Sequence, residues 1–150
     1  MKIETSQKIT PYLWYDHQAK EAADFYCSLF PDAKIISASD MIVEYELAGT
    51  QFIGLNGGPK FTFTEAVSFL ITCRDQEEVD HYWYGLTAKG GEESMCGWLR
   101  DRYGLSWQVV PERFLELMKT GDPDRTRKVL DALMNMQRIV ISDLENAYNS

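Results

Sequence analysis

The amino-acid sequence predicts an α+β fold in which two βαβββ modules are followed by a helical extension. A strand–helix–three-strand pattern over about residues 9–56 recurs over about residues 66–111. GTQFI at 49–53 and GLSWQ at 104–108 occupy equivalent places in the two patterns, which indicates a weak internal repeat. The pattern becomes helical in residues 112–150. At 150 residues, the chain is long enough for a single domain with a sizeable core.

The first module begins with a predicted strand at residues 9–15, ITPYLWY, which has a proline near its start, as an edge strand tolerates. Asp16 and the polar residues after it predict the cap of a helix over about residues 18–29, in which apolar residues recur at helical spacing. Pro31 ends that helix. The NGGP sequence at 56–59 breaks regular structure and marks the end of the module. Between the helix and NGGP, three strands are predicted at 34–38, 41–47 and 51–56.

The second module follows the same order, beginning with a predicted strand at residues 66–73. Asp75 opens a helix and has Glu78 three residues on, which is the spacing of a capping box. Gly90 and the glycine after it end this helix, and a short strand at 92–94 follows. The apolar stripe of the helix consists of Val79, Tyr82, Trp83 and Leu86.

The stretch CGWLRDRYGLSWQVVP, residues 96–111, reads as a β-hairpin that completes the second module. Aromatic and branched residues flank a polar turn in which Gly104 can adopt a positive φ. Alternation places Ser106, Gln108 and Val110 on one face of the second hairpin strand. A face that carries serine and glutamine suits a ligand cavity, and it suits equally an edge strand with one solvated side. The opposite face carries Leu105, Trp107 and Val109.

The segment after the hairpin predicts helices. A short helix is expected at 113–118, and Asp122 with the proline after it predicts the start of a second helix. Residues 143–148 predict a final helical turn. The apolar face of the second helix consists of Val129, Leu130, Leu133 and Met136.

Composition and charge exclude several classes of partner. The formal net charge is −8 with no basic patch, which argues against nucleic acid. No stretch approaches the length of a membrane span, and the N-terminal residues lack the apolar core of a signal peptide. The three cysteines lack metal-ligand spacing and fit reduced thiols. The sequence thus predicts a soluble cytoplasmic protein.

Four segments carry a resemblance to a known family: residues 9–35, 52–69, 76–83 and 96–111, with LNGGP, CGW and GLSWQVVP as their most specific motifs. They resemble the PhnB-like group, whose family label is 3-demethylubiquinone-9 3-methyltransferase, in the glyoxalase/bleomycin-resistance/dioxygenase (vicinal oxygen chelate) superfamily. The resemblance implies a curved, mostly antiparallel sheet around a cleft, with the C-terminal helices appended. The family has a longer loop where this chain keeps only residues 37–41, which leaves the lid and the dimer contacts of that loop open.

The resemblance also tests for a metal site. In metal-dependent members, His or Glu ligands come from strand positions that fall here at about Thr10, Ile53, Ser68 and Gln108. Of these, only Gln108 could bind a metal, and its amide oxygen is a weak ligand. A divalent ion is usually bound by two or three His or carboxylate groups. His17 and His81 fall at none of these positions. The sequence thus predicts no metal ion. It predicts no cofactor either, because NGGP follows a strand without opening a helix, unlike the glycine loop of a nucleotide site.

Alternation predicts which side chains line the cavity. With Gln108 facing inward, Tyr12 and Trp14 of the first strand and Ser68 of the fifth face inward as well. Trp98 and Arg100 of the hairpin complete the predicted ligand-binding set, Arg100 as an anchor for an anion. Glu44 and Glu46 fall on the same concave side, where one could act as a general base. An ordinary solvated strand face is the more usual setting for two such carboxylates.

Two functions remain open from the sequence. The first is a module that binds a small apolar or aromatic molecule in a metal-free cavity between the modules. The second is a metal-independent enzyme that uses Glu44 or Glu46 on a quinone- or phenol-like substrate, as the family label suggests.

The sequence further predicts a homodimer. Superfamily members commonly close their cavities by packing two chains. An exposed strand edge also has unpaired backbone N–H and C=O groups, which promote aggregation unless they are covered. The helix after Asp122 has an apolar face broader than one contact requires, because Met134 extends it. We therefore expect part of residues 112–148 in the interface.

Overall fold

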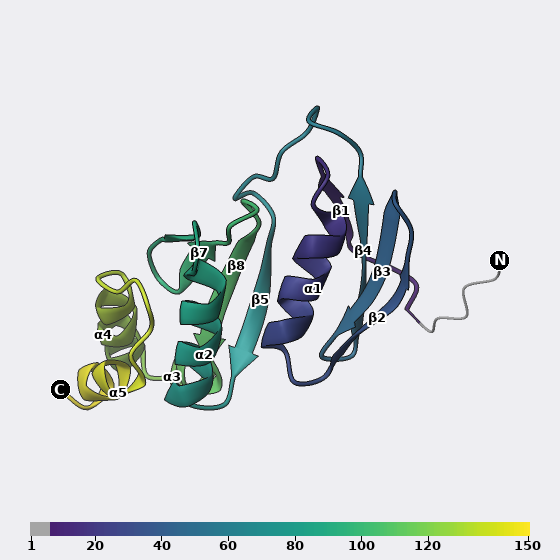
Figure 1. Ribbon diagram of the computed structural model, residues 1–150. Coiled ribbons are helices and arrows are strands. Elements are labelled where there is room, and N and C mark those ends of the chain that lie inside the picture. The colour runs from purple at the N-terminus through teal and green to yellow at the C-terminus, as the bar shows by residue number, and fades with distance from the viewer. Residues whose placement is uncertain (1–6) are drawn as a thin grey trace. The chain divides into compact units, whose positions relative to one another are not determined.

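A computed structural model describes residues 7–150, which form two compact units whose boundary in the sequence lies between Thr62 and Phe63 (Figure 1). Each unit contains one four-stranded mixed sheet with a long helix packed on it. Three further helices follow the second sheet. The predicted α+β fold with two βαβββ modules and C-terminal helices is confirmed. Within the described residues, no helix is both long and apolar enough to cross a bilayer.

The first unit has the strand order β1-β4-β3-β2. Strands β1 and β4 are parallel, and the other neighbouring pairs are antiparallel. A two-residue turn joins β3 to β4 through Ala48 and Gly49, both at positive φ, as a tight hairpin requires. The elements are β1 (Tyr12–Tyr15), α1 (Ala19–Leu29), β2 (Ala33–Ala38), β3 (Ile42–Leu47) and β4 (Thr50–Asn56).

The second unit repeats this topology with the order β5-β8-β7-β6, in which β5 and β8 are parallel. The strand registers are equivalent as well, with Ile53 of β4 corresponding to Gln108 of β8. Tyr12 and Glu44 lie on either side of Ile53, and Leu70 and Trp98 lie in the same way on either side of Gln108. The weak repeat in the sequence is therefore a structural repeat. The elements are β5 (Ser68–Cys73), α2 (Gln76–Thr87), β6 (Glu92–Glu93), β7 (Trp98–Arg100) and β8 (Ser106–Pro111).

Helix α1 packs on the first sheet through small residues. Its buried face includes Ala19, Ala22 and Tyr26, and it contacts β3, where Val43 and Tyr45 are buried. Alanines permit a close approach of helix and sheet. The apolar spacing predicted a helix in this place, and the buried alternation of β3 is as the sequence predicts.

The cap of α1 differs from the expectation. Asp16 lies outside the helix, and the N-cap residue Gln18 makes no capping hydrogen bond with its side chain. The N–H of Ala19, in the first turn of the helix, instead donates to Oδ1 of Asn56 at 2.8 Å. The same Asn56 side chain donates to the carbonyl of Asp40 at 2.9 Å, so one residue at the end of β4 caps the helix and holds a neighbouring loop.

Two strands begin later than predicted. Strand β1 starts at Tyr12 because Pro11 has no N–H to donate, although its carbonyl accepts from Ile53 at 3.0 Å. Strand β5 starts at Ser68 because the N–H of Val67 closes a turn onto the carbonyl of Thr64. In both places the apolar residues ahead of the strand are exposed.

The cap of α2 is half of the predicted capping box. The side chain of Asp75 accepts from the N–H of Glu78 at 2.9 Å. The Glu78 carboxylate turns to Arg74 instead, at 3.3 Å. The apolar stripe of this helix is buried as predicted, in Val79, Tyr82, Trp83 and Leu86.

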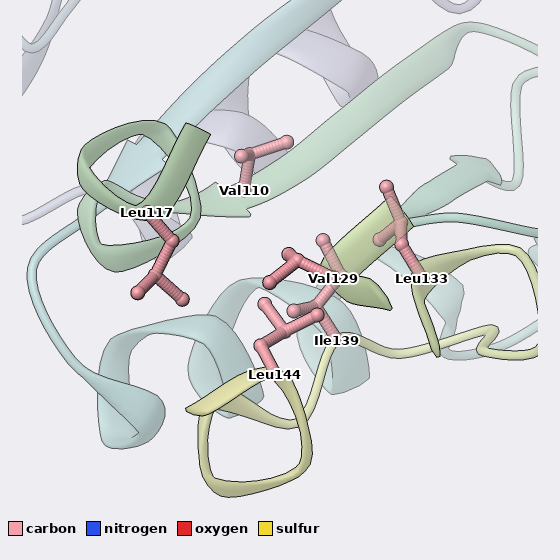
Figure 2. Packing of buried hydrophobic residues seen from close by; sticks show 6 residues of the cluster. All are labelled: Val110, Leu117, Val129, Leu133, Ile139 and Leu144. Carbon is pink, nitrogen blue, oxygen red and sulfur yellow. The ribbon is translucent and has the colours of Figure 1, made fainter. Parts of the chain in front are cut away.

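The extension forms its own small core with the end of β8 (Figure 2). Val129 and Leu133 of α4 are buried there, whereas Leu130 and Met134 remain exposed. Part of the apolar face of α4 is therefore covered within the chain, and the homodimer stays a prediction. The helices are α3 (Glu112–Met118), α4 (Pro123–Leu133) and α5 (Ile141–Asn149), and the core consists of Val110, Leu117, Val129, Leu133, Ile139 and Leu144.

The extension is also bonded to the backbone ahead of β7. The N–H groups of Cys96 and Gly97 donate to the carbonyls of Met136 and Gln137 at 2.7 and 2.9 Å. Gly97 has a φ of +83°, and a Cβ there would lie 2.8 Å from Cδ1 of Ile139. This glycine is needed both for its conformation and for the space it leaves.

We expect Asn56→Ala to lower the free energy of unfolding by about 1–2 kcal/mol, because it removes the acceptor that caps α1. Asp16→Ala is the matched control and should change stability by less than about 0.5 kcal/mol, as an exposed site does. Urea unfolding followed by circular dichroism measures both. Equal losses in the two variants would contradict the observed cap.

We expect Gly97→Ala to destabilise the protein by about 3 kcal/mol, since it adds overpacking against Ile139 to the strain of positive φ. Gly121 is the control: its φ is +78°, and nothing lies within 4 Å of the added Cβ. Gly121→Ala should cost only the strain, about 1–2 kcal/mol. The same unfolding experiment compares them, and a Gly97 variant no worse than the Gly121 variant would be inconsistent with the docking of the extension.

Candidate functional site

Each sheet has one face covered by its helix and one face on the other side, which we call the open face. In the second sheet the covered face is apolar and buried, with Leu99, Trp107 and Val109 at its centre. Cross-strand pairing gives the open face two rows of side chains. One row is Ser68–Ser106–Arg100–Glu92, and the next is Leu70–Gln108–Trp98.

Four of the residues predicted for the site therefore lie together on one surface: Ser68, Trp98, Arg100 and Gln108. The amide of Gln108 donates to Oγ of Ser68 at 3.0 Å. Two of the positions expected for metal ligands thus bond to each other as amide and hydroxyl. No group of three or more His, Cys, Asp or Glu residues with metal-binding geometry occurs within residues 7–150.

A hollow of about 140 Å³ lies at one end of this open face. Arg100 lines it and pairs with Glu65, at 3.2 Å, and with Glu92. The hydrogen bond and charge of Glu92, followed by the charge of Glu65, raise the pKa of the Arg100 guanidinium above its usual value. An anion at Arg100 would compete with two carboxylates already in place. Sequence reasoning missed Glu65 and Glu92, because a charged residue in a loop or a two-residue strand carries no signal.

Ser106 lines the same hollow and is fully buried. Its Oγ atom has no hydrogen-bond partner among the described residues. A buried hydroxyl without a partner costs free energy, about 1–3 kcal/mol. Ser106 is therefore a polar group at the hollow that a ligand could satisfy. Alternation predicted the orientation of Ser106 but not its complete burial.

The open face of the first sheet carries Tyr12, which is exposed, and Trp14, which is half-buried. The Trp14 side chain already has partners within its own unit. Its Nε1 donates to the carbonyl of Gly58 at 2.8 Å, and its ring packs against Phe61 at 4.9 Å between centroids. A Cβ on Gly57 would lie 2.4 Å from this indole. Trp14 therefore fills the space at the NGGP loop, residues 56–59. The residues of this loop do not fit the phosphate cradle of a nucleotide-type cofactor.

A second hollow, of about 250 Å³, lies in the first unit. Glu44 lines it, half-buried, and accepts a hydrogen bond from Oγ of Ser37 at 3.1 Å. Glu46 lies in the neighbouring row between Gln51 and Lys34 and does not line the hollow. The structure thus separates the two candidate bases. The other lining residues are Gln7, Lys8, Thr10, Ile36, Gln51, Phe52 and Ile53.

None of the cysteines and histidines lines either hollow. Burial, reinforced by the charge of Glu78, raises the pKa of the Cys73 thiol to about 12, so this thiol stays protonated and unreactive. The Cys96 Sγ lies 3.8 Å from the sulfur of Met134. His17 is exposed beside Asp16, and His81 packs edge-on against the ring of the next residue.

Comparison with known proteins gives a family match and several similar structures. The family model for 3-demethylubiquinone-9 3-methyltransferase matches residues 7–110 and ends before the extension. A PhnB protein from Bacillus cereus is 33% identical with a TM-score of 0.66, over 70% of this chain and 99% of that chain. No curated protein shows a significant match.

More distant structures share the fold. A glyoxalase/bleomycin resistance protein from Albidiferax ferrireducens is 16% identical with a TM-score of 0.52, over 70% of this chain and 98% of that chain. A fosfomycin resistance protein from Listeria monocytogenes, in complex with Mn(II) and sulfate, is 17% identical with a TM-score of 0.53. That match covers 72% of this chain and 91% of the other.

Proposed function

The chain belongs to the 3-demethylubiquinone-9 3-methyltransferase family, which is PhnB-like and has the vicinal-oxygen-chelate fold, and from this premise we propose that it binds a small apolar or aromatic molecule without a metal ion. The proposed contact surface is the open face of the second sheet. The observation that carries the proposal is the row Leu70–Gln108–Trp98, which leads to a hollow with an unsatisfied buried hydroxyl.

The chemistry of this row suits an aromatic ligand with a polar substituent. Leu70 is half exposed, at 51%, although it is a large apolar side chain on a sheet. Trp98 lies on the other side of Gln108, so two apolar groups flank one polar group. Ligand sites combine apolar walls with a few placed polar groups in this way. A ring can lie against the apolar flanks while a polar atom bonds to Ser68 or Gln108.

The size of the hollow limits what enters it. At about 140 Å³ it is smaller than the roughly 300–1,000 Å³ pockets that hold drug-sized molecules. The hollow therefore holds one substituent, and the body of the ligand lies over the sheet. A second copy of the chain is the partner we propose to cover the remainder, in keeping with the homodimer predicted from the sequence.

A second candidate function is a metal-independent enzyme for a quinone- or phenol-like substrate, with Glu44 as general base. The observation in its favour is that Glu44 lines the larger hollow, half-buried, while Glu46 does not. In the methyl-transfer reaction of the family name, the methyl donor would need a site of its own. The NGGP loop at 56–59, filled by Trp14, does not supply one.

We expect 1-naphthol to raise the melting temperature of the protein, because a ligand that binds only the folded state stabilises it by mass action. Trp98→Leu should weaken naphthol binding about tenfold through loss of aromatic contact. Tyr84→Ala, at an exposed aromatic residue on α2, is the matched control and should leave binding unchanged. Thermal shift and calorimetric titration measure these effects, with circular dichroism to confirm folding.

Glu44→Gln separates the two functions. A binding protein keeps its naphthol affinity in this variant and in Glu46→Gln. An enzyme that uses Glu44 loses turnover of a quinone or phenol, followed by absorbance, in the first variant alone. Naphthol affinity equal in the Trp98→Leu and Tyr84→Ala proteins would overturn the proposed surface.

A further inference from the structure

The hollow beside Trp98 has an excess of negative charge. Glu65, Glu92 and Glu93 line it, and Arg100 is the one cationic side chain among its lining residues. Arg100 is already paired with Glu65 and Glu92. Glu93 pairs with Leu99 of the covered face, and one of its carboxylate oxygens accepts from Nε1 of Trp83 of α2 at 2.8 Å, so the negative charge at the open face comes from Glu65 and Glu92. The walls therefore attract a cation and repel an anion.

A second observation shows that the hollow is more than an acidic patch. The Ser106 hydroxyl lines it, is fully buried and has no hydrogen-bond partner among the described residues. Pairing of Ser106 with Arg100 across the β7–β8 ladder places this hydroxyl on the open face, toward the hollow. A hydroxyl oxygen can accept a hydrogen bond from an N–H group there.

The third component is the indole of Trp98, which also lines the hollow. The face of an indole attracts organic cations, and carboxylates nearby strengthen the attraction. An ammonium group has three N–H donors, which matches a hollow that offers carboxylate and hydroxyl acceptors. A bare metal ion fits less well, since no cluster of three metal-type ligands occurs in residues 7–150.

We propose that this hollow binds the protonated amino group of a small aromatic amine, whose ring lies over Trp98 and Leu70. The proposal rests on the function proposed above and names its ligand class. Glu65 and Glu92 supply the charge, and Ser106 supplies a hydrogen-bond acceptor. The anion expected at Arg100 from the sequence is replaced here by a cation, because Arg100 serves to hold the two carboxylates at the hollow.

Three probes of one shape test the charge: 2-phenylethylamine, 2-phenylethanol and 3-phenylpropionate, titrated by calorimetry at pH 7. We expect the amine to bind about tenfold more tightly than the alcohol, and the carboxylate more weakly than both. Salt should weaken binding of the amine and leave that of the alcohol nearly unchanged.

Glu65→Gln should weaken amine binding about fivefold while alcohol binding changes little, because only the amine is charged. Ser106→Ala should also weaken amine binding about fivefold, because it removes a hydrogen-bond acceptor. Glu116→Gln is the matched control, since Glu116 pairs with Arg113 at the same 3.2 Å and lies outside the hollow. It should leave both affinities unchanged. Glu65 is exposed in a loop, so its variant folds normally even if Ser106→Ala does not.

The outcomes separate this inference from the function on which it rests. Equal binding of amine and alcohol would overturn the amine site and leave the aromatic-ligand proposal in place. Tightest binding of the carboxylate would overturn it in favour of an anion at Arg100. Failure of all three probes, together with 1-naphthol, would overturn both proposals.

Discussion

A buried carboxylate at Asp101 holds the hairpin on which the second open face depends. It is almost completely excluded from solvent, which is costly for a charge unless its lone pairs are used. They are used: the side chain accepts from Nε1 of Trp107 at 2.9 Å and from the N–H of Leu105 at 3.1 Å. The turn and the covered face are thereby joined through one residue. Arg100 and Ser106 immediately flank this turn and pair across the ladder, so the carboxylate fixes where both meet the hollow.

Local patterns predicted most of the fold because they depend on neighbouring residues. Period-two alternation predicted the buried face of β3, and the Asp75 cap follows from its spacing to the first helical turn. The cap of α1 depends instead on Asn56, which is 37 residues away from Ala19 in the sequence. Asp16 is a plausible local cap, and nothing in the sequence ranks the distant side chain above it. The fold was predictable where the interaction is local and unpredictable where it closes a long loop.

The candidate site divides in the same way. Register and alternation predicted that Ser68, Trp98 and Gln108 share a face, since the strand period is fixed by backbone geometry. The charge of that face was not predictable, because it depends on Glu65 in the loop before β5 pairing with Arg100. Trp14 shows the reverse case: alternation placed it on the open face, but its indole is engaged by the glycine loop. Orientation follows from the strand, whereas availability to a ligand depends on what else the chain brings nearby.

The extension belongs to this architecture although the family model ends at residue 110. Cys96 and Gly97 both adopt positive φ, and for Cys96 this is a conformation that side chains disfavour. Donation of their N–H groups to the carbonyls of Met136 and Gln137 offsets that cost and sets the direction in which the chain enters β7 at Trp98. The core of the extension also holds Ile139 next to Gly97, so the extension packs against the backbone that enters β7. The backbone that enters β7 is therefore bonded to the extension as well as to the strands of its own module, and helices beyond the family match take part in the fold next to Trp98.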